Sequence, residues 1–231
     1  MIVLTGDTST QYCGISILSD KEVMVELSFQ NQATHSRNMI ENIDYCLNLC
    51  GKTVQDIDLF AAGIGPGNFT GVRIGVSTLK GLAYSTGKPL LGISSLDALA
   101  YQLKFSERPV CAAIDARRGE VYYAFYYFND SKLVYKTEEK VAKPEMISKD
   151  TDVRGILITG SGGRLYKDIF DLSFENVYYA PCFQSRVSTS ASGELALDRY
   201  LATGKDETFG VVPNYIRKSN AEENMILYKN R

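Results

Sequence analysis

A glycine-rich stretch at residues 63–75 constrains the fold of this chain more than any other part of the sequence. It reads GIGPGNFTGVRIG and follows a short apolar run. Glycine adopts backbone conformations that are closed to other residues, while Pro66 fixes its own φ and disfavours helix at the residue before it. The stretch therefore predicts a buried strand, a tight loop, and then a helix over residues 70–84 whose N-cap is Asn68 or Thr70.

The helix predicted over residues 70–84 combines an apolar stripe with unusual glycines. Its apolar side chains recur every three to four residues, as on a buried helix face: Val72, Val76, Leu79 and Ala83. Gly71, Gly75 and Gly81 accompany this stripe, and each interior glycine costs roughly 1 kcal/mol relative to alanine. Small residues four apart let another backbone approach closely. The helix therefore either packs closely on the protein's own sheet or forms a docking face for a second protein.

Charge and residue usage exclude several classes of protein. The 231 residues carry a formal net charge of −2, which argues against strong RNA binding by the chain alone. The pair Arg117-Arg118 is either solvated surface or a local RNA contact. Five cysteines without a CxxC motif are typical of reduced thiols, and His35 is the only histidine, which excludes sites built on several histidines. The amino terminus resembles a strand rather than a signal peptide, and no apolar run could span a bilayer, so we expect a cytoplasmic protein without membrane contact.

The order of predicted elements repeats within the chain. An apolar strand ends in an acid at Asp7 and is followed by a turn, a strand, a turn and a strand. After the polar segment 104–109, an apolar strand ends in an acid at Asp115, and the same order recurs, with its third strand expected over residues 133–141. Such repetition predicts two related α/β subdomains with mixed sheets, at residues 1–104 and 105–231, and a tail that can pack back on the first subdomain.

Three segments carry residues that could contact phosphate: Asp7-Thr8-Ser9, Asp115, and Gly160, Gly162 and Gly163 of a late glycine turn. A strand-end aspartate can hold a hydrated magnesium ion, and a glycine turn lets a nucleotide approach the backbone. Ordinary structural turns explain the same residues equally well. The stretch at residues 63–75 is not a Walker A loop, because no lysine follows its second glycine at the required spacing.

The duplicated halves, with acids at both first-strand ends, resemble the actin, Hsp70 and sugar-kinase (ASKHA) superfamily. Within it the chain is similar to the TsaB (YeaZ) family. Four segments carry this resemblance: residues 7–9, residues 65–75, residues 113–122 and, more weakly, residues 213–217. The resemblance implies the ASKHA fold and a non-catalytic subunit that heterodimerises with TsaD and acts with the ATPase TsaE. Their reaction transfers a threonylcarbamoyl group to the tRNA adenosine beside the anticodon. It further implies tRNA contact only through the complex, a homodimer when the chain is alone, and no cofactor beyond weak ATP or ADP binding.

The resemblance also bears on metal binding. TsaD-like sequences carry a metal-binding His-xxx-His, and the corresponding positions here are Ser95 and Leu99. Leucine cannot ligate a metal, so we expect neither a metal site, nor catalytic residues, nor peptidase activity.

We expect partner contact through the helix over residues 70–84 and an amphipathic helix that begins at His35. The candidate interface residues on these helices are Thr70, Gly71, Arg73, Ile74, Gly75, Thr78, Leu79, Met39 and Ile43. The alternative function is an independent ATPase or small-molecule kinase, in which Asp7 and Asp115 surround magnesium and ATP. The bulky pair Arg117-Arg118, which follows Asp115, speaks against this alternative, because nucleotide-binding relatives tend to have small residues in that turn.

Overall fold

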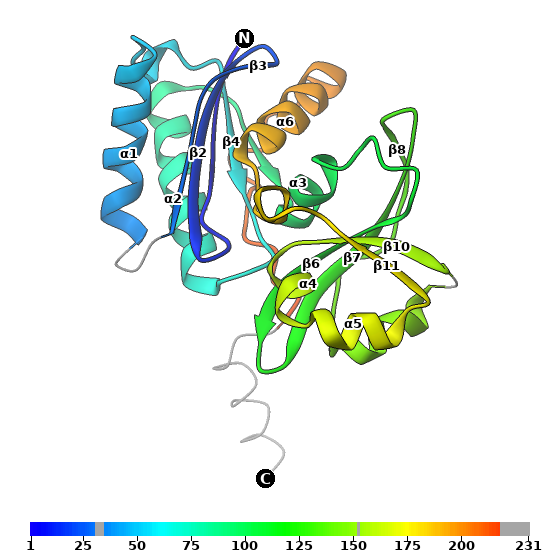
Figure 1. The fold of residues 1–231 in the computed structure, drawn as a ribbon. Helices are drawn as coiled ribbons and strands as arrows, with labels where there is room; N and C mark the ends of the chain where they lie inside the picture. The colour runs from blue at the N-terminus through cyan, green and yellow to red at the C-terminus, as the bar shows by residue number, and fades with distance from the viewer. Residues whose placement is uncertain (31–34, 152, 218–231) are drawn as a thin grey trace.

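The computed structural model describes residues 1–30, 35–151 and 153–217, which form two mixed β-sheets with helices around them (Figure 1). The first sheet contains β1 (Ile2–Asp7), β2 (Tyr12–Ser19), β3 (Glu22–Gln30), β4 (Leu59–Gly63) and β5 (Leu90–Ile93). The second sheet contains β6 (Val110–Arg117), β7 (Glu120–Asn129), β8 (Lys132–Lys136), β9 (Lys140–Ala142), β10 (Gly155–Thr159) and β11 (Asn176–Tyr179). The helices are α1 (His35–Leu49), α2 (Phe69–Thr86), α3 (Ser95–Tyr101), α4 (Ser161–Leu165), α5 (Lys167–Ser173) and α6 (Thr189–Thr203). Short 3₁₀ helices span Val54–Asp56, Pro144–Asp150 and Cys182–Ser185.

The two sheets have the same topology. The strand order is β3-β2-β1-β4-β5 in the first sheet and β8-β7-β6-β10-β11 in the second, where β9 also pairs with β7. In each sheet the first strand pairs antiparallel with the second and parallel with the strand on its other side. The carboxyl ends of β1 and β6 therefore hold equivalent positions, as the two strand-end acids predict. This agreement confirms the duplicated α/β architecture.

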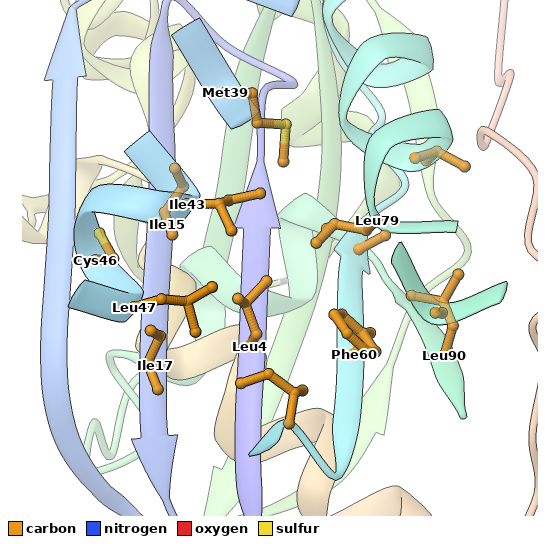
Figure 2. Packing of buried hydrophobic residues seen from close by; sticks show 14 of the residues in the cluster. Leu4, Ile15, Ile17, Met39, Ile43, Cys46, Leu47, Phe60, Leu79 and Leu90 are labelled. Carbon is orange, nitrogen blue, oxygen red and sulfur yellow. The ribbon is translucent and has the colours of Figure 1, made fainter. Parts of the chain in front are cut away.

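The first sheet is covered on both faces, and alternate residues of its strands serve the two layers. Leu4 and Phe60 point toward α1 and α2, where they meet Met39 and Leu79 (Figure 2). Val3, the neighbour of Leu4, belongs instead to a cluster of buried side chains on the other face, shared with α6. The amphipathic pattern of α1 thus reflects burial against the sheet, and Cys46 lies in the same core with no exposed surface.

A longer segment of the second half packs against the first half than the tail that the sequence predicts. Ala196 and Leu197 of α6 pack against Val3 and Leu18 of the first sheet. Residues 204–217, here called the strap, then run back along the first half. The Glu207 amide donates to the Leu90 carbonyl at 3.0 Å and the Asn214 amide to the Ile64 carbonyl at 2.8 Å. The last strand of the first sheet, β5, and the first strand of the second sheet, β6, lie on either side of residues 104–109, and the last layer over the first sheet comes from the end of the chain.

One local prediction is wrong, one is right with shifted bounds, and one cannot be compared. The strand expected over residues 133–141 is divided into β8 and β9. At Thr137 the amide still donates to the Phe125 carbonyl at 3.0 Å, but the Thr137 hydroxyl, in place of the Thr137 carbonyl, accepts from the Phe125 amide at 2.9 Å. A helix that the sequence predicts over residues 165–170 is present as α5, which begins two residues later, and α4 before it includes the glycine turn. A last helix expected over residues 222–228 lies outside the described residues, as does the environment of the His35 side chain. Within the described ranges, no helix has the length and apolarity needed to cross a membrane.

Candidate functional site between the two halves

A pocket of about 750 Å³ lies between the two halves. The first half contributes the β1–β2 loop, residues 67–69 and part of α3, and the second half contributes the β6–β7 turn and the start of α4. Residues 185–187 and the end of the strap complete the wall. We call this the interlobe pocket. Its volume is in the range of pockets that hold small ligands.

A polar junction beside the interlobe pocket joins the halves. The Glu139 carboxylate accepts hydrogen bonds from Ser94 Oγ at 2.6 Å, from Lys136 Nζ at 2.7 Å and from Asn214 Nδ2 at 2.7 Å. These three donors belong to the first half, the second half and the strap. Burial by itself lowers the pKa of Lys136, but the charges of Asp97 and Glu139 outweigh it and raise this pKa. The junction therefore holds a charged, paired lysine.

Asp7 is buried rather than open to the pocket, since its side chain is only 2% exposed. One carboxylate oxygen accepts from the Ser9 amide at 2.7 Å and the Ser9 hydroxyl at 2.6 Å, and the other accepts from Ser95 Oγ at 2.6 Å. Any side chain at Gly63 would overlap this carboxylate. Asp7 therefore connects β1, the β1–β2 loop and α3, and both of its oxygens are occupied by protein donors.

Two of the three glycines of α2, Gly71 and Gly75, face the β1–β2 loop, whereas Gly81 is exposed. A Cβ atom at Gly71 would overlap the carbonyl oxygen of Thr8, and one at Gly75 would lie 2.5 Å from Thr8 Oγ1. Thr8 is itself fully buried, and its hydroxyl donates to the Gly71 carbonyl at 2.6 Å. The Asn68 amide donates to the Ser9 carbonyl at 2.6 Å, and Asn68 Oδ1 caps the helix by accepting from the Gly71 amide at 3.0 Å. Of the two readings of these glycines, the structure supports close packing within the protein's own fold.

This packing corrects part of the expected interface. Five of its nine residues are buried in the first half and offer no docking surface: Gly71, Gly75, Leu79, Met39 and Ile43. Met39 and Ile43 lie on the buried side of α1, and the other three lie on the buried side of α2. The remaining four reach the surface of α2: Thr70, Arg73, Ile74 and Thr78.

The late glycine turn is also used for packing. A Cβ atom at Gly160, whose φ is 100°, would overlap the Ala113 carbonyl, and one at Gly162 would lie 2.7 Å from Val121 Cγ1. One at Gly163 would overlap Ile158. These glycines let α4 lie directly on the second sheet. None of the three lines the interlobe pocket. Of the seven residues that the sequence suggests for phosphate contact, only Ser9 and Asp115 line this pocket.

Asp115 lies at the pocket wall and is held by its own turn. Its carboxylate accepts from the Arg117 amide at 2.9 Å, and the Arg117 guanidinium lies 3.5 Å away. The Asp115 amide donates to Ser161 Oγ at 3.1 Å. Burial and the nearby Asp115 carboxylate together raise the pKa of the Tyr166 hydroxyl. The second-half acid is thus part of a local polar cluster that remains accessible from the pocket.

The two positions that correspond to metal ligands in TsaD-like sequences lie close to this region. Ser95 is fully buried and donates to Asp7, whereas Leu99 is 1% exposed and supplies apolar wall to the pocket. No cluster of three or more His, Cys, Asp or Glu side chains arranged to hold a metal ion occurs in the part of the chain that the structure describes.

Sequence reasoning missed several arginine and aromatic side chains of the pocket. The Arg186 guanidinium stacks over the Tyr12 ring at 4.4 Å from its centroid. In the strap, the Tyr215 ring lies 4.7 Å from that of Phe69, and its hydroxyl accepts from Arg73 Nε at 2.7 Å. No local motif marks these residues, because pairs such as Tyr12 and Arg186 meet only after the second half has folded against the first.

Comparisons with known proteins agree with this architecture. The family model described as "TsaD: tRNA N6-adenosine threonylcarbamoyltransferase" matches residues 29–225. The tRNA threonylcarbamoyladenosine biosynthesis protein TsaB of Escherichia coli is 33% identical, over 73% of this chain and 75% of that protein. The Bacillus subtilis protein of the same name is 30% identical, over 98% of each chain.

Solved structures place the fold in the same group. YeaZ from Pseudomonas aeruginosa superposes with a TM-score of 0.79 at 25% identity, covering 93% of this chain and 99% of that one. An activator of the 2-hydroxyisocaproyl-CoA dehydratase from Clostridium difficile superposes with a TM-score of 0.51 at 9% identity, covering 88% and 97%, which concerns the fold alone. The fold is the actin/Hsp70/sugar-kinase-like α/β fold, and the chain belongs to the TsaB (YeaZ) family.

Proposed function

We propose that this chain is a non-catalytic subunit in tRNA threonylcarbamoyladenosine biosynthesis, which pairs with a TsaD protein and acts together with TsaE. The observation that carries the proposal is the identity and environment of the two residues at the positions that correspond to metal ligands in TsaD-like sequences. Ser95 uses its hydroxyl to hold Asp7, and Leu99 has no atom that can coordinate a metal. A chain of this family without that chemistry contributes by binding, and its catalytic partner supplies the reacting groups. The tRNA is then held by the assembled complex.

The partner surface in this proposal is the outer side of α1 and α2, which lie side by side (Figure 1). It combines the exposed apolar side chain of Ile40 on α1 with Arg73 and Ile74 of α2. The Arg73 guanidinium lies 3.9 Å from the centroid of the Phe69 ring and is tied to the strap through Tyr215. An apolar face with a pre-oriented arginine suits a protein partner. The same face would pair two copies of the chain when TsaD is absent.

Ile40→Asp should greatly weaken pairing with TsaD, because a carboxylate would be buried without a partner at the interface. We expect a loss of affinity of roughly 30-fold or more, measured as the mass of the mixed proteins by multi-angle light scattering. Leu201→Asp is the matched control, since Leu201 is 65% exposed, Ile40 is 57% exposed, and α6 covers the opposite face of the first sheet. Equal loss in both variants, or in neither, would show that the outer side of α1 and α2 is not the interface.

We further propose that the chain does not use magnesium-bound ATP. The Asp7 carboxylate is enclosed and the glycines at 160, 162 and 163 are in contact with the second sheet, so neither offers the surface that a magnesium nucleotide needs. The purified chain should release no phosphate from ATP above background, with or without magnesium. Turnover that disappears in Asp115→Asn would instead support the independent ATPase or kinase.

A further inference from the structure

Positive charge gathers at the mouth of the interlobe pocket, although the whole chain has a net charge of −2. The described residues that line the pocket include four arginines but only one acidic residue, Asp115. Arg117 and Arg118 come from the β6–β7 turn and Arg186 from the segment before α6, and all three are exposed. We call these three the arginine cluster. The fourth, Arg217, is largely covered and ion-paired with Glu120.

The backbone of the β6–β7 turn does not favour the arginines that it carries. Arg117 and Arg118 have φ values of 63° and 56°, in the left-handed region that disfavours long side chains. The next hairpin turn, between β7 and β8, places Asp130 and Ser131 at φ 48° and 61°, where short polar side chains are better suited. Asparagine or glycine would fit positions 117 and 118 better, so the arginines stand there against the local backbone preference. Such a conflict is expected where a side chain has a functional task.

The chemistry of the cluster matches phosphate in a nucleic acid. A guanidinium presents several donors in a planar fork that fits phosphate oxygens. The stacked pair of Arg186 and Tyr12 adds a flat surface, and single-stranded RNA is bound by basic side chains together with aromatic or guanidinium planes on which bases stack. We propose that the arginine cluster binds the phosphate backbone of single-stranded tRNA segments at the pocket mouth, which rests on the proposed function in tRNA modification.

The position of the cluster favours an extended RNA over a free nucleotide. The Arg117 side chain is 80% exposed, so its guanidinium lies at the rim rather than in the depth of the pocket. Asp115 contacts this guanidinium from the pocket side. A small ligand inside the pocket would meet a mixed wall of apolar and neutral polar side chains, with Asp115 and the ion-paired Arg217 as its charged groups. A strand that crosses the mouth would instead meet all three arginines of the cluster. The acidic chain as a whole keeps this contact weak and sensitive to salt.

The test compares two double variants with the same change of charge. Arg117→Asn with Arg118→Asn removes the rim charges and suits the left-handed turn, so we expect an unchanged or higher Tm. Lys132→Asn with Arg154→Asn is the control, since both residues are exposed and lie away from the pocket. Lys132 begins β8 and pairs with the last residue of β7, and Arg154 directly precedes β10. Binding of a fluorescein-labelled tRNA transcript to the complex with TsaD is followed by anisotropy between about 25 and 200 mM salt, the range in which phosphate contacts are resolved.

The expected result is a loss of salt dependence confined to the rim variant. Each single-stranded phosphate contact contributes about 0.7 to the slope of log K against log salt, so loss of two contacts should reduce the slope by about 1.4. The control should keep the wild-type slope. An unchanged slope in the rim variant, or an equal reduction in the control, overturns the proposal.

Two further measurements separate the alternatives. Fluorescent ATP is titrated with and without magnesium, and a rim variant that loses ATP binding but keeps its RNA slope would assign the arginines to a free nucleotide and overturn the RNA proposal. Light scattering on the same samples reports the complex with TsaD. If the rim variant still forms the complex with TsaD and its slope of log K against log salt is unchanged, the RNA proposal is wrong while the proposed function stands. If no complex forms, the proposed function fails, and the isolated chain at about 25 mM salt still tests the arginine cluster.

Discussion

Gly71→Val should strongly destabilise the protein. A side chain at this position would overlap the Thr8 carbonyl oxygen, which is backbone and cannot rotate away. The Thr8 loop has little freedom to retreat, because the Thr8 hydroxyl is bonded to the Gly71 carbonyl and the adjoining Ser9 carbonyl accepts from Asn68. We expect a loss of about 3 kcal/mol or more in the free energy of unfolding, measured by urea denaturation followed by far-ultraviolet circular dichroism.

Gly81→Ala is the matched control within the same helix. Gly81 is exposed, and a Cβ atom there would meet nothing within 4 Å. Alanine should therefore stabilise the protein by roughly 0.5 to 1 kcal/mol, through its higher helix propensity. Similar losses in both variants would contradict the packing argument. The contrast also shows that a variant at Gly71 or Gly75 cannot test partner binding, since any loss of the complex would report damage to the fold.

Asp7→Ala should lower the free energy of unfolding by about 3 kcal/mol or more in the absence of any nucleotide. Removing the carboxylate leaves the Ser9 amide, the Ser9 hydroxyl and the Ser95 hydroxyl without their acceptor in a buried place. Each buried donor left unsatisfied costs about 1 to 3 kcal/mol, and partial re-pairing of the hydroxyls reduces the sum. The measurement is urea unfolding of the purified chain.

Asp115→Ala provides the comparison for the other strand-end acid. Asp115 is partly exposed, and the Arg117 amide that it accepts from lies in an exposed turn where water can replace the carboxylate. We expect a change below about 1 kcal/mol. A magnesium ligand at position 7 would show the opposite behaviour, because the alanine variant would keep its stability and lose only nucleotide binding. That outcome would restore the ATPase or kinase reading.

The duplicated order of strands could be predicted because alternation, turns and strand-end acids are local features of the sequence. The roles of Asp7 and Gly71 could not be predicted in the same way. A strand-end position does not reveal whether a carboxylate faces a pocket or turns toward a serine 88 residues away. A glycine in a helix indicates that another group approaches closely, but it does not identify that group. Internal packing of α2 and docking of a second protein therefore predict glycine at the same positions. Only the tertiary contacts of Gly71 distinguish the two.

The arginine cluster could be predicted from the sequence only in part. The pair Arg117-Arg118 is visible as adjacent charges, and its turn follows from the predicted hairpin. Arg186 joins it through the course of the chain between β11 and α6, for which the sequence carries no signal. The sequence likewise did not predict how much of the second half packs against the first half. The apolar spacing of α6 predicts a buried helix face, but it does not indicate which sheet that face covers.

The placement of α6 has a consequence for synthesis of the protein. Strands β1 to β5 leave the ribosome first, yet the layer that shields Val3 and Leu18 is encoded at residues 189–203. Until that segment emerges, the nascent first sheet has one apolar face without its own cover, the kind of surface that chaperones recognise. The amino-terminal half therefore completes its fold after the carboxyl-terminal half has been made, and the two halves mature as one cooperative unit.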